Sequence, residues 1–182
     1  DITITEQTEK GHGFLSDVVD AWERAIDGNI KESTRVVYLR TGVVLGKNGG
    51  IFQKLMLPFR FFAGGYPGNG TQWFPWIHIQ DVSRAIAFLV KTGSARGIYN
   101  LSAPDTVQMK TFYSEISKKI NKPVWLAVPE FILKLIPGGM GNDLLLTSQR
   151  VIPSRLIESG FQFYYPDLGS ALNDLLDKKK TI

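Results

Sequence analysis

Apolar side chains near the beginning of the chain recur every four residues, at Phe14, Val18, Trp22 and Ile26. This spacing places them on one face and predicts an amphipathic helix, which Gly28-Asn29 should end. The next apolar run, from Arg35 to Leu45, does not alternate and is typical of a strand buried on both faces. A helix followed by such a strand is half of a parallel βαβ unit.

The rest of the hydrophobic pattern continues this alternation. Helical spacing predicts helices at 51–60, 82–89, 109–120, 130–136, 153–159 and 168–175. Short apolar runs predict strands at 97–101 and 122–126. Asp81 and Asp167 are the expected N-caps of the helices that follow them, and Gly160 should end the helix that Pro153 begins. The pattern therefore predicts an α/β protein.

Residues 46–75 do not fit this alternation, apart from the short helix expected at 51–60. Glycines and prolines crowd the segment, at Gly46, Gly49, Gly50, Pro58, Gly64, Gly65, Pro67, Gly68, Gly70 and Pro75. Their spacing is not that of a phosphate cradle, and no helix start follows them directly. Two interpretations stay open: a long ordered loop that bears a hairpin, or part of a substrate site, because long loops in compact domains are often functional.

The composition is that of an ordinary globular protein, with 182 residues, 43% of them hydrophobic. The absence of cysteine excludes disulfides and cysteine-ligated zinc, and two histidines are too few for a typical zinc centre, so no metal is expected. No apolar run is long enough to cross a bilayer, and Asp1–Glu6 lacks the features of a signal peptide. We therefore expect a cytoplasmic protein with no membrane partner.

The net charge of +4 bears on nucleic acid as a partner. Basic residues are scattered along the chain, apart from Lys178–Lys180, whereas a nucleic-acid binder usually concentrates them in one stripe. The lysine run fits a solvated helix end, where the helix dipole favours positive charge. We expect no nucleic-acid partner; the alternative, a nucleic-acid binder, predicts binding that depends strongly on salt.

Three features carry candidate chemistry, and each has a structural alternative. His78 precedes Asp81 by three residues, so the two form either an acid–base pair or a helix cap with a packed histidine. Arg40 lies in the apolar strand and needs a partner, either a cofactor or a carboxylate. The aromatic residues within 73–76 either line a cleft or belong to the core.

Several short segments match a known family in order along nearly the whole chain. They are Phe14-Leu15…Trp22-Glu23, Arg40-Thr-Gly-Val-Val-Leu-Gly46, Gly49-Gly50, Leu57-Pro-Phe-Arg60, Gly64-Gly65…Gln72, Trp76-Ile-His-Ile-Gln-Asp81, Tyr99-Asn100…Ala103-Pro104, Leu146…Arg150-Val-Ile-Pro153, Gly160-Phe161 and Tyr165-Pro-Asp-Leu168. The ordered set resembles the extended short-chain dehydrogenase/reductase superfamily. It is most similar to a branch of NAD(P)-dependent nucleotide-sugar epimerases, the cell-division-inhibitor-like family, which has a C-terminal domain of unknown function.

The resemblance implies the C-terminal part of a Rossmann-type parallel sheet with a small α+β lobe on the substrate side, matching the C-terminal two-thirds of the family's length. Residues 1–105 would belong to the NAD(P)-binding domain, with a substrate-side loop at 46–76, and residues 106–182 would form the C-terminal lobe. The implied cofactor is NAD(P), with NADP(H) favoured, and it would lie beside Arg40, Thr41, Gly42 and Val43. The implied substrate cleft is lined by Gln72, Trp76 and His78.

The resemblance also implies a reaction class. In this family the chemistry is hydride transfer to and from the nicotinamide, and an epimerase oxidises and re-reduces one substrate without net redox change. The implied partner is a small-molecule substrate, sugar-like or otherwise small and polar. The sequence indicates no oligomeric state.

The chain departs from the family's pattern at the positions that carry catalysis. The glycine-rich pyrophosphate fingerprint and the acid–base tyrosine would lie upstream of Asp1. The lysine that follows that tyrosine has no counterpart in the first helix, where Trp22 precedes Glu23. We therefore assign no catalytic residue, and we expect this chain by itself to be inactive and to bind cofactor weakly.

A second departure concerns the nucleotide. Sugar-nucleotide epimerases hold it with an arginine and a tyrosine whose positions read Phe74 and Trp76 here, so phosphate charge loses its obvious partner. These departures keep an alternative function open, a non-catalytic Rossmann-fold module that senses cofactor or binds protein.

Overall fold

The computed structural model describes residues 2–11, 13–27, 31, 33–60, 64–128 and 147–177. Its helices are α1 (Phe14–Asp27), α2 (Ile51–Arg60), α3 (Ile79–Lys91), α4 (Met109–Ile120), α7 (Ser154–Glu158) and α8 (Leu168–Leu176). Its strands are β1 (Thr3–Ile4), β2 (Val37–Thr41), β3 (Val43–Leu45), β4 (Gly64–Pro67), β5 (Trp73–Phe74), β6 (Trp76–His78), β7 (Gly97–Leu101), β8 (Val107–Gln108), β9 (Val124–Val128) and β10 (Arg150–Val151). The predicted alternation of helices and strands is confirmed.

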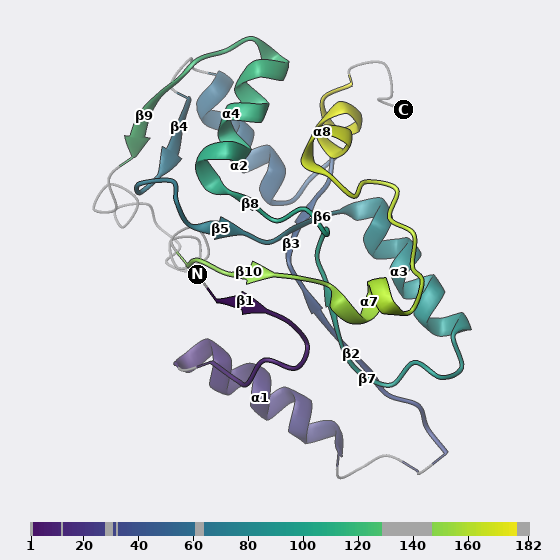
Figure 1. Ribbon diagram of the computed structural model, residues 1–182. Helices are drawn as coiled ribbons and strands as arrows, with labels where there is room; N and C mark the ends of the chain where they lie inside the picture. The colour runs from purple at the N-terminus through teal and green to yellow at the C-terminus, as the bar shows by residue number, and fades with distance from the viewer. Residues whose placement is uncertain are drawn as a thin grey trace.

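Parallel pairing dominates the strands, as expected of a Rossmann-type fold. The pairs β2–β7, β3–β6, β1–β10 and β4–β9 are parallel, and β5–β8 is antiparallel. Figure 1 shows α2, α4 and α8 gathered at one end of these strands, α3 and α7 beside β7, and α1 at the opposite end of the view from α4. The mixed α/β architecture confirms the predicted fold class.

The long apolar run of the sequence changes partner at Gly42. Up to Thr41 it pairs with β7, and the Gly42 N–H still donates to the Leu101 carbonyl, over 2.9 Å. The next N–H, that of Val43, donates to the Pro75 carbonyl, and β3 then pairs with β6. A Cβ at Gly42 would lie 2.9 Å from the Pro75 oxygen, closer than side chains tolerate. The crossing of the two backbones therefore requires glycine.

The prediction that this run is buried on both faces is wrong for β2. Val43 and Leu45 of β3 are buried, but Leu39 of β2 is 39% exposed. Among the described strands, β2 pairs on one edge alone, with β7. The helix before it shows the same feature, since Phe14 and Trp22 of α1 are 78% and 71% exposed. An apolar run indicates that a segment tends to be buried, but it does not indicate which helices or strands pack on each of its faces.

Two apolar clusters hold the described fold together. The larger joins α2, α4 and α8 to β3, with Phe52, Phe59, Phe112, Ile116 and Leu172 at its centre. The smaller packs α3 against β7 and α7, with Ile77, Leu89, Leu101, Leu156 and Phe161. Each cluster draws residues from both sides of residue 105. The division of the chain into 1–105 and 106–182 stays a prediction.

Among its described residues, the glycine-rich segment turns back on itself at Gly46 and Gly49, which form an isolated antiparallel bridge, and it forms no longer hairpin. Its two strands have distant partners: β4 pairs with β9, and β5 pairs with β8. Gly64 lies so close to β9 that an added Cβ would meet the Pro123 oxygen at 2.5 Å. The glycines thus permit close backbone approach to a later part of the chain, which local spacing cannot reveal.

The helix boundaries match the predictions with one exception. Asp167 caps α8 through a 2.8 Å bond from the Ser170 N–H, and Gly160, at φ +82°, follows α7. Asp81, however, is not the N-cap of α3; His78 holds that position and its Nδ1 accepts from the Gln80 N–H. Asp81 instead lies inside the first turn. The expected helix at 130–136 and the helix end at Gly28-Asn29 lie outside the described residues.

Candidate functional site

The fold brings the predicted cofactor-binding residues to the carboxyl ends of parallel strands. Thr41 is in register with Leu101, so β2 and β7 end side by side. Ligands of open α/β sheets bind beyond such strand ends. Thr41 is exposed, Gly42 is half-buried and Val43 is buried, so a ligand at this edge meets Thr41 first.

Arg40 pairs with a carboxylate, which is one of the two alternatives open from the sequence. Its Nε and Nη2 donate to the two carboxylate oxygens of Glu23, over 2.8 and 2.7 Å. These hydrogen bonds raise the pKa of Arg40 above its ordinary value. The bidentate pair ties α1 to β2 directly beside the strand end, and it leaves the Nη1 group of Arg40 for other acceptors.

The residues expected to line a substrate cleft are all buried. Trp76 is 1% exposed and donates its Nε1–H to the Asp105 carbonyl over 3.0 Å. Gln72 is 7% exposed, and its amide donates to the Pro67 carbonyl. His78 is 1% exposed. Their assignment to a substrate cleft stays a prediction.

His78 and Asp81 do not form the acid–base pair that the sequence left open. The Nε2 of His78 lies 3.4 Å from Asp174 Oδ2 on α8, and its ring lies 3.8 Å from the ring of Tyr165, centroid to centroid. Burial lowers the pKa of His78, and the attraction of Asp174 and Asp81 only partly opposes this. Burial thus favours the neutral imidazole, and His78 is a packed helix cap.

Asp81 has no exposed surface and holds the C-terminal segment in place. Its two oxygens accept from the backbone N–H groups of Tyr164 and Tyr165, over 2.9 and 2.8 Å. Nη1 of Arg84 lies 2.9 Å from Oδ1 of the same carboxylate. His78 and Asp81 thus anchor residues 164–174 at two points: Asp81 holds the backbone of Tyr164 and Tyr165, and His78 lies against Asp174.

The burial of His78 predicts a loss of stability in acid. Its pKa in the folded protein is below the ordinary value of 6.5, so the unfolded chain binds the proton more readily. The contribution of His78 to the free energy of unfolding is complete above pH 6.5. It declines as the pH falls through 6.5 toward the lower pKa of the folded protein, by up to about 1.4 kcal/mol per pH unit. Urea unfolding of the full-length protein between pH 5 and pH 8 measures it.

Two variants test whether His78 causes this pH dependence of stability. His78→Gln should remove this part of the pH dependence, whereas Asp174→Asn should steepen it because the carboxylate no longer favours the charged imidazole. An identical pH profile for the wild type and His78→Gln would contradict the assignment.

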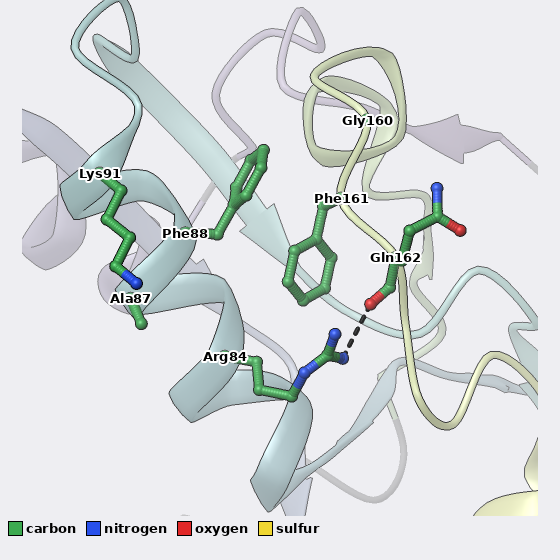
Figure 2. Close-up of a pocket in the computed structure, with 7 residues that line it drawn as sticks. All are labelled: Arg84, Ala87, Phe88, Lys91, Gly160, Phe161 and Gln162. Carbon is green, nitrogen blue, oxygen red and sulfur yellow. Dashed lines mark hydrogen bonds between the residues drawn. The ribbon is translucent and has the colours of Figure 1, made fainter.

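A shallow pocket of about 390 Å³ lies elsewhere, between α3 and residues 160–162 (Figure 2). Its lining consists of Arg84, Ala87, Phe88, Lys91, Gly160, Phe161 and Gln162. Arg84 donates to the Gln162 carbonyl over 2.8 Å as well as to Asp81, and it lies 3.3 Å from the Tyr164 ring centroid. Nη1 of Arg84 is therefore engaged in structure, and the pocket contains none of the residues predicted to bind cofactor or substrate.

Two further features escaped the sequence reasoning. Glu6 is 8% exposed, and its Oε1 accepts from the backbone N–H groups of Asn100 and Arg155, which ties the first residues of the chain to β7 and α7. Arg150 lies over the indole of Trp73. The burial of Glu6 was not predictable, because a single Glu in a polar stretch does not alter the hydrophobic periodicity. Arg150 was identified only as part of a segment that matches the family, and its contact with Trp73 was not predicted.

Within the described part of the chain, no group of three or more metal-ligating side chains gathers. None of the helices described is both long and apolar enough to cross a membrane.

Comparison with known proteins agrees with the parallel strand pairs and intervening helices of a Rossmann-type protein. Residues 128–175 match a domain of unknown function (DUF1731). An epimerase family protein of Staphylococcus aureus, SAR0825, is 40% identical over 165 residues, which are 91% of this chain and 55% of the relative. The chain thus spans about half the length of the curated relative it matches.

Two of the similar solved structures are themselves epimerases by name. The human epimerase family protein SDR39U1, determined with NADPH, has 31% identity and a TM-score of 0.90, over 97% of this chain and 60% of that one. A nucleoside-diphosphate sugar epimerase of Corynebacterium glutamicum has 29% identity and a TM-score of 0.75, over 97% of this chain and 34% of that one. The predicted resemblance to the epimerase branch of the extended short-chain dehydrogenase/reductase superfamily is confirmed.

Proposed function

We propose that this chain is the substrate-side portion of an NAD(P)-dependent epimerase or oxidoreductase that acts on a sugar-like or other small polar substrate in the cytoplasm. The observation that carries the proposal is the position of Arg40–Val43 at the shared carboxyl end of β2 and β7. The human relative in complex with NADPH supports the cofactor, and NADP(H) is the form we favour.

The residues at this strand end fit a cofactor contact. The N–H groups of Gly42 and Val43 are used within the sheet, so Thr41, which is exposed, is the residue with a hydroxyl to offer. Arg40 is fixed by Glu23, whose carboxylate balances the charge of its guanidinium. A bound nicotinamide supplies the hydride acceptor and donor. The chain's own part is to position the cofactor through Thr41 and to keep its surroundings apolar through Val43.

The proposal predicts that Thr41→Val weakens NADPH binding by about 5–10-fold, because one hydrogen bond is lost. Fluorescence titration of the full-length protein with NADPH measures the dissociation constant. Thr34→Val is the matched control, since Thr34 is exposed and precedes the opposite end of β2; it should leave the constant unchanged. A wild type that shows no saturable binding at millimolar NADPH would sink the proposal.

One observation favours a second candidate, a non-catalytic module that senses cofactor or binds protein. The family's catalytic lysine is expected on α1, whose sequence FLSDVVDAWERAID has no lysine. On the same helix, Glu23 is committed to the ion pair with Arg40. Saturable NADPH binding by a protein that neither oxidises NADPH with a panel of keto sugars nor epimerises the corresponding sugars would favour this candidate.

A further inference from the structure

The pocket between α3 and residues 160–162 has an apolar wall. Phe88 and Phe161 form this wall together with Ala87, and the two rings pack against each other with their centroids 5.5 Å apart (Figure 2). Because the rings contact each other, a bound molecule lies over them and not between them. At about 390 Å³, the pocket has the size that suits a small molecule.

Lys91 brings to this pocket a positive charge that no described residue neutralises. Lys91 is exposed and is the last residue of α3. Figure 2 shows its side chain extended along the helix toward Ala87, with the ammonium group at the pocket. Among the described residues, no carboxylate lies within ion-pair distance of that ammonium group.

The end of α3 does not need Lys91 as a cap. A basic residue in the last turn commonly serves the free carbonyl groups of that turn. In this helix Arg35 takes that role, since its two Nη groups donate to the carbonyls of Leu89 and Val90, each over 3.0 Å. The ammonium group of Lys91 is therefore available to a ligand.

Arg84 brings a second cation to the same face of α3, about two turns before Lys91. Its Nη1 donates to Asp81 and to the Gln162 carbonyl, whereas its Nε and Nη2 have no hydrogen-bond partner among the described residues. The ring of Tyr164 covers one face of the guanidinium, with its centroid 3.3 Å from Cζ. The free N–H groups in the guanidinium plane are those that a ligand can meet.

The charges around the pocket favour a ligand with one negative charge. Arg84 is paired with the buried carboxylate of Asp81, so the two cations and this one anion leave a single net positive charge. One carboxylate balances that charge and accepts from both Lys91 and Arg84. The second negative charge of a phosphate dianion would find no counterpart and would be repelled by Asp81.

We infer that this pocket binds a small aromatic carboxylate. Its ring would lie over Phe88 and Phe161, where ring–ring contacts add to the burial of apolar surface. Its carboxylate would accept charge-assisted hydrogen bonds from Lys91 and Arg84. The pocket shares no residue with the strand end at Arg40–Val43, so the inference does not rest on the proposed function.

Calorimetric titration of the full-length protein with 3-phenylpropionate at pH 8 tests the site. The wild type should bind this probe saturably. The amide 3-phenylpropanamide has the same shape without the charge, and acetate has the charge without the ring. Each should bind at least about 10-fold more weakly, because one of the two contacts is lost.

The dianion 2-phenylethyl phosphate tests the preference for a single charge. It should bind more weakly than 3-phenylpropionate at pH 8. Equal or tighter binding of the phosphate would overturn the assignment of the pocket to a carboxylate.

Two variants at exposed positions of α3 test the placement of the ligand. Lys91→Gln should raise the dissociation constant about 5–10-fold, because a charge-assisted contact is lost. Ala87→Trp should abolish binding, since the new ring fills the pocket. Urea unfolding checks that both variants remain folded. Lys54→Gln, at an exposed lysine of α2, is the matched control and should change nothing.

The outcomes separate this inference from the proposed function. Absence of saturable 3-phenylpropionate binding, or equal binding by the wild type, Lys91→Gln and Ala87→Trp, overturns the site. Displacement of the probe by NADPH also overturns it, because the probe would then occupy the cofactor site. Binding that depends on Lys91 and is unchanged by NADPH upholds the site, whether or not the protein binds NADPH.

A carboxylate beside an aromatic ring also occurs at the end of a peptide. N-acetyl-glycyl-phenylalanine carries both groups in that form and is titrated alongside 3-phenylpropionate. Tighter binding of the peptide would assign the pocket to a peptide C-terminus and overturn the assignment to a small molecule.

Discussion

Replacing Asp81 with alanine should lower the free energy of unfolding by about 3–5 kcal/mol, because it breaks a buried ion pair and leaves its partners unpaired. Asp81 has no exposed surface, and its carboxylate satisfies Arg84 and the backbone N–H groups of Tyr164 and Tyr165. The N–H groups of Tyr164 and Tyr165 lose their acceptor at once, and Arg84 keeps only the Gln162 carbonyl. The loss should also loosen α8 from α3, since residues 164–165 lead into α8.

Urea unfolding of the full-length protein measures this effect. Asp81→Asn should recover only part of the loss, because the amide keeps one acceptor oxygen and loses the charge. Glu115→Gln is the matched control: Glu115 also pairs with a basic residue three positions later, Lys118, but at the surface. Exposed pairs contribute about 0–1 kcal/mol, so a similar loss in both variants would contradict the role given to Asp81.

Replacing Trp76 with alanine should cost about 3–5 kcal/mol, the range for large aromatic side chains deleted from a core. Trp76 is 1% exposed and packs within the larger apolar cluster. Its Nε1–H also satisfies the Asp105 carbonyl. Trp76→Phe keeps most of the apolar volume and should cost about 1–2 kcal/mol, from the lost hydrogen bond and a smaller cavity.

The same variants decide between the two roles open to Trp76. If Trp76 is only a core residue, Trp76→Phe should lower the free energy of unfolding and leave ligand binding unchanged. A cleft residue predicts weaker ligand binding with little loss of stability. Val90→Ala, at an apolar side chain that is 67% exposed, is the control and should stay within about 0.5 kcal/mol of the wild type.

The helices and strands were predictable because their signals are local. The four-residue spacing of α1, the cap at Asp167 and the glycine after α7 each act within one or two turns of helix, so nearby residues suffice to define them. The N-cap of α3 was misassigned for the same reason. His78 and Asp81 are both able to cap, and the choice depends on Tyr164 and Tyr165, more than eighty residues later.

The candidate site was predictable in part. Arg40–Val43 were identified from a family motif, and the parallel register with β7 brings them to a strand end. Gln72, Trp76 and His78 come from other segments that match the same family, but they are buried among residues from α4 and α8 that the sequence gives no reason to place there. Arg150 and Trp73 are far apart in the chain, and only the fold brings them together.

The sequence by itself determined the class of fold, the order of most elements and the resemblance to the epimerase branch, because periodicity, capping residues and ordered motifs are properties of the chain. The tertiary structure alone decided the partners: Glu23 for Arg40, Asp174 for His78, the backbone of 164–165 for Asp81, and Trp73 for Arg150. A charged or polar side chain must find a partner when it is buried, but its type does not say which one. That choice follows from packing, which brings distant segments within hydrogen-bonding distance.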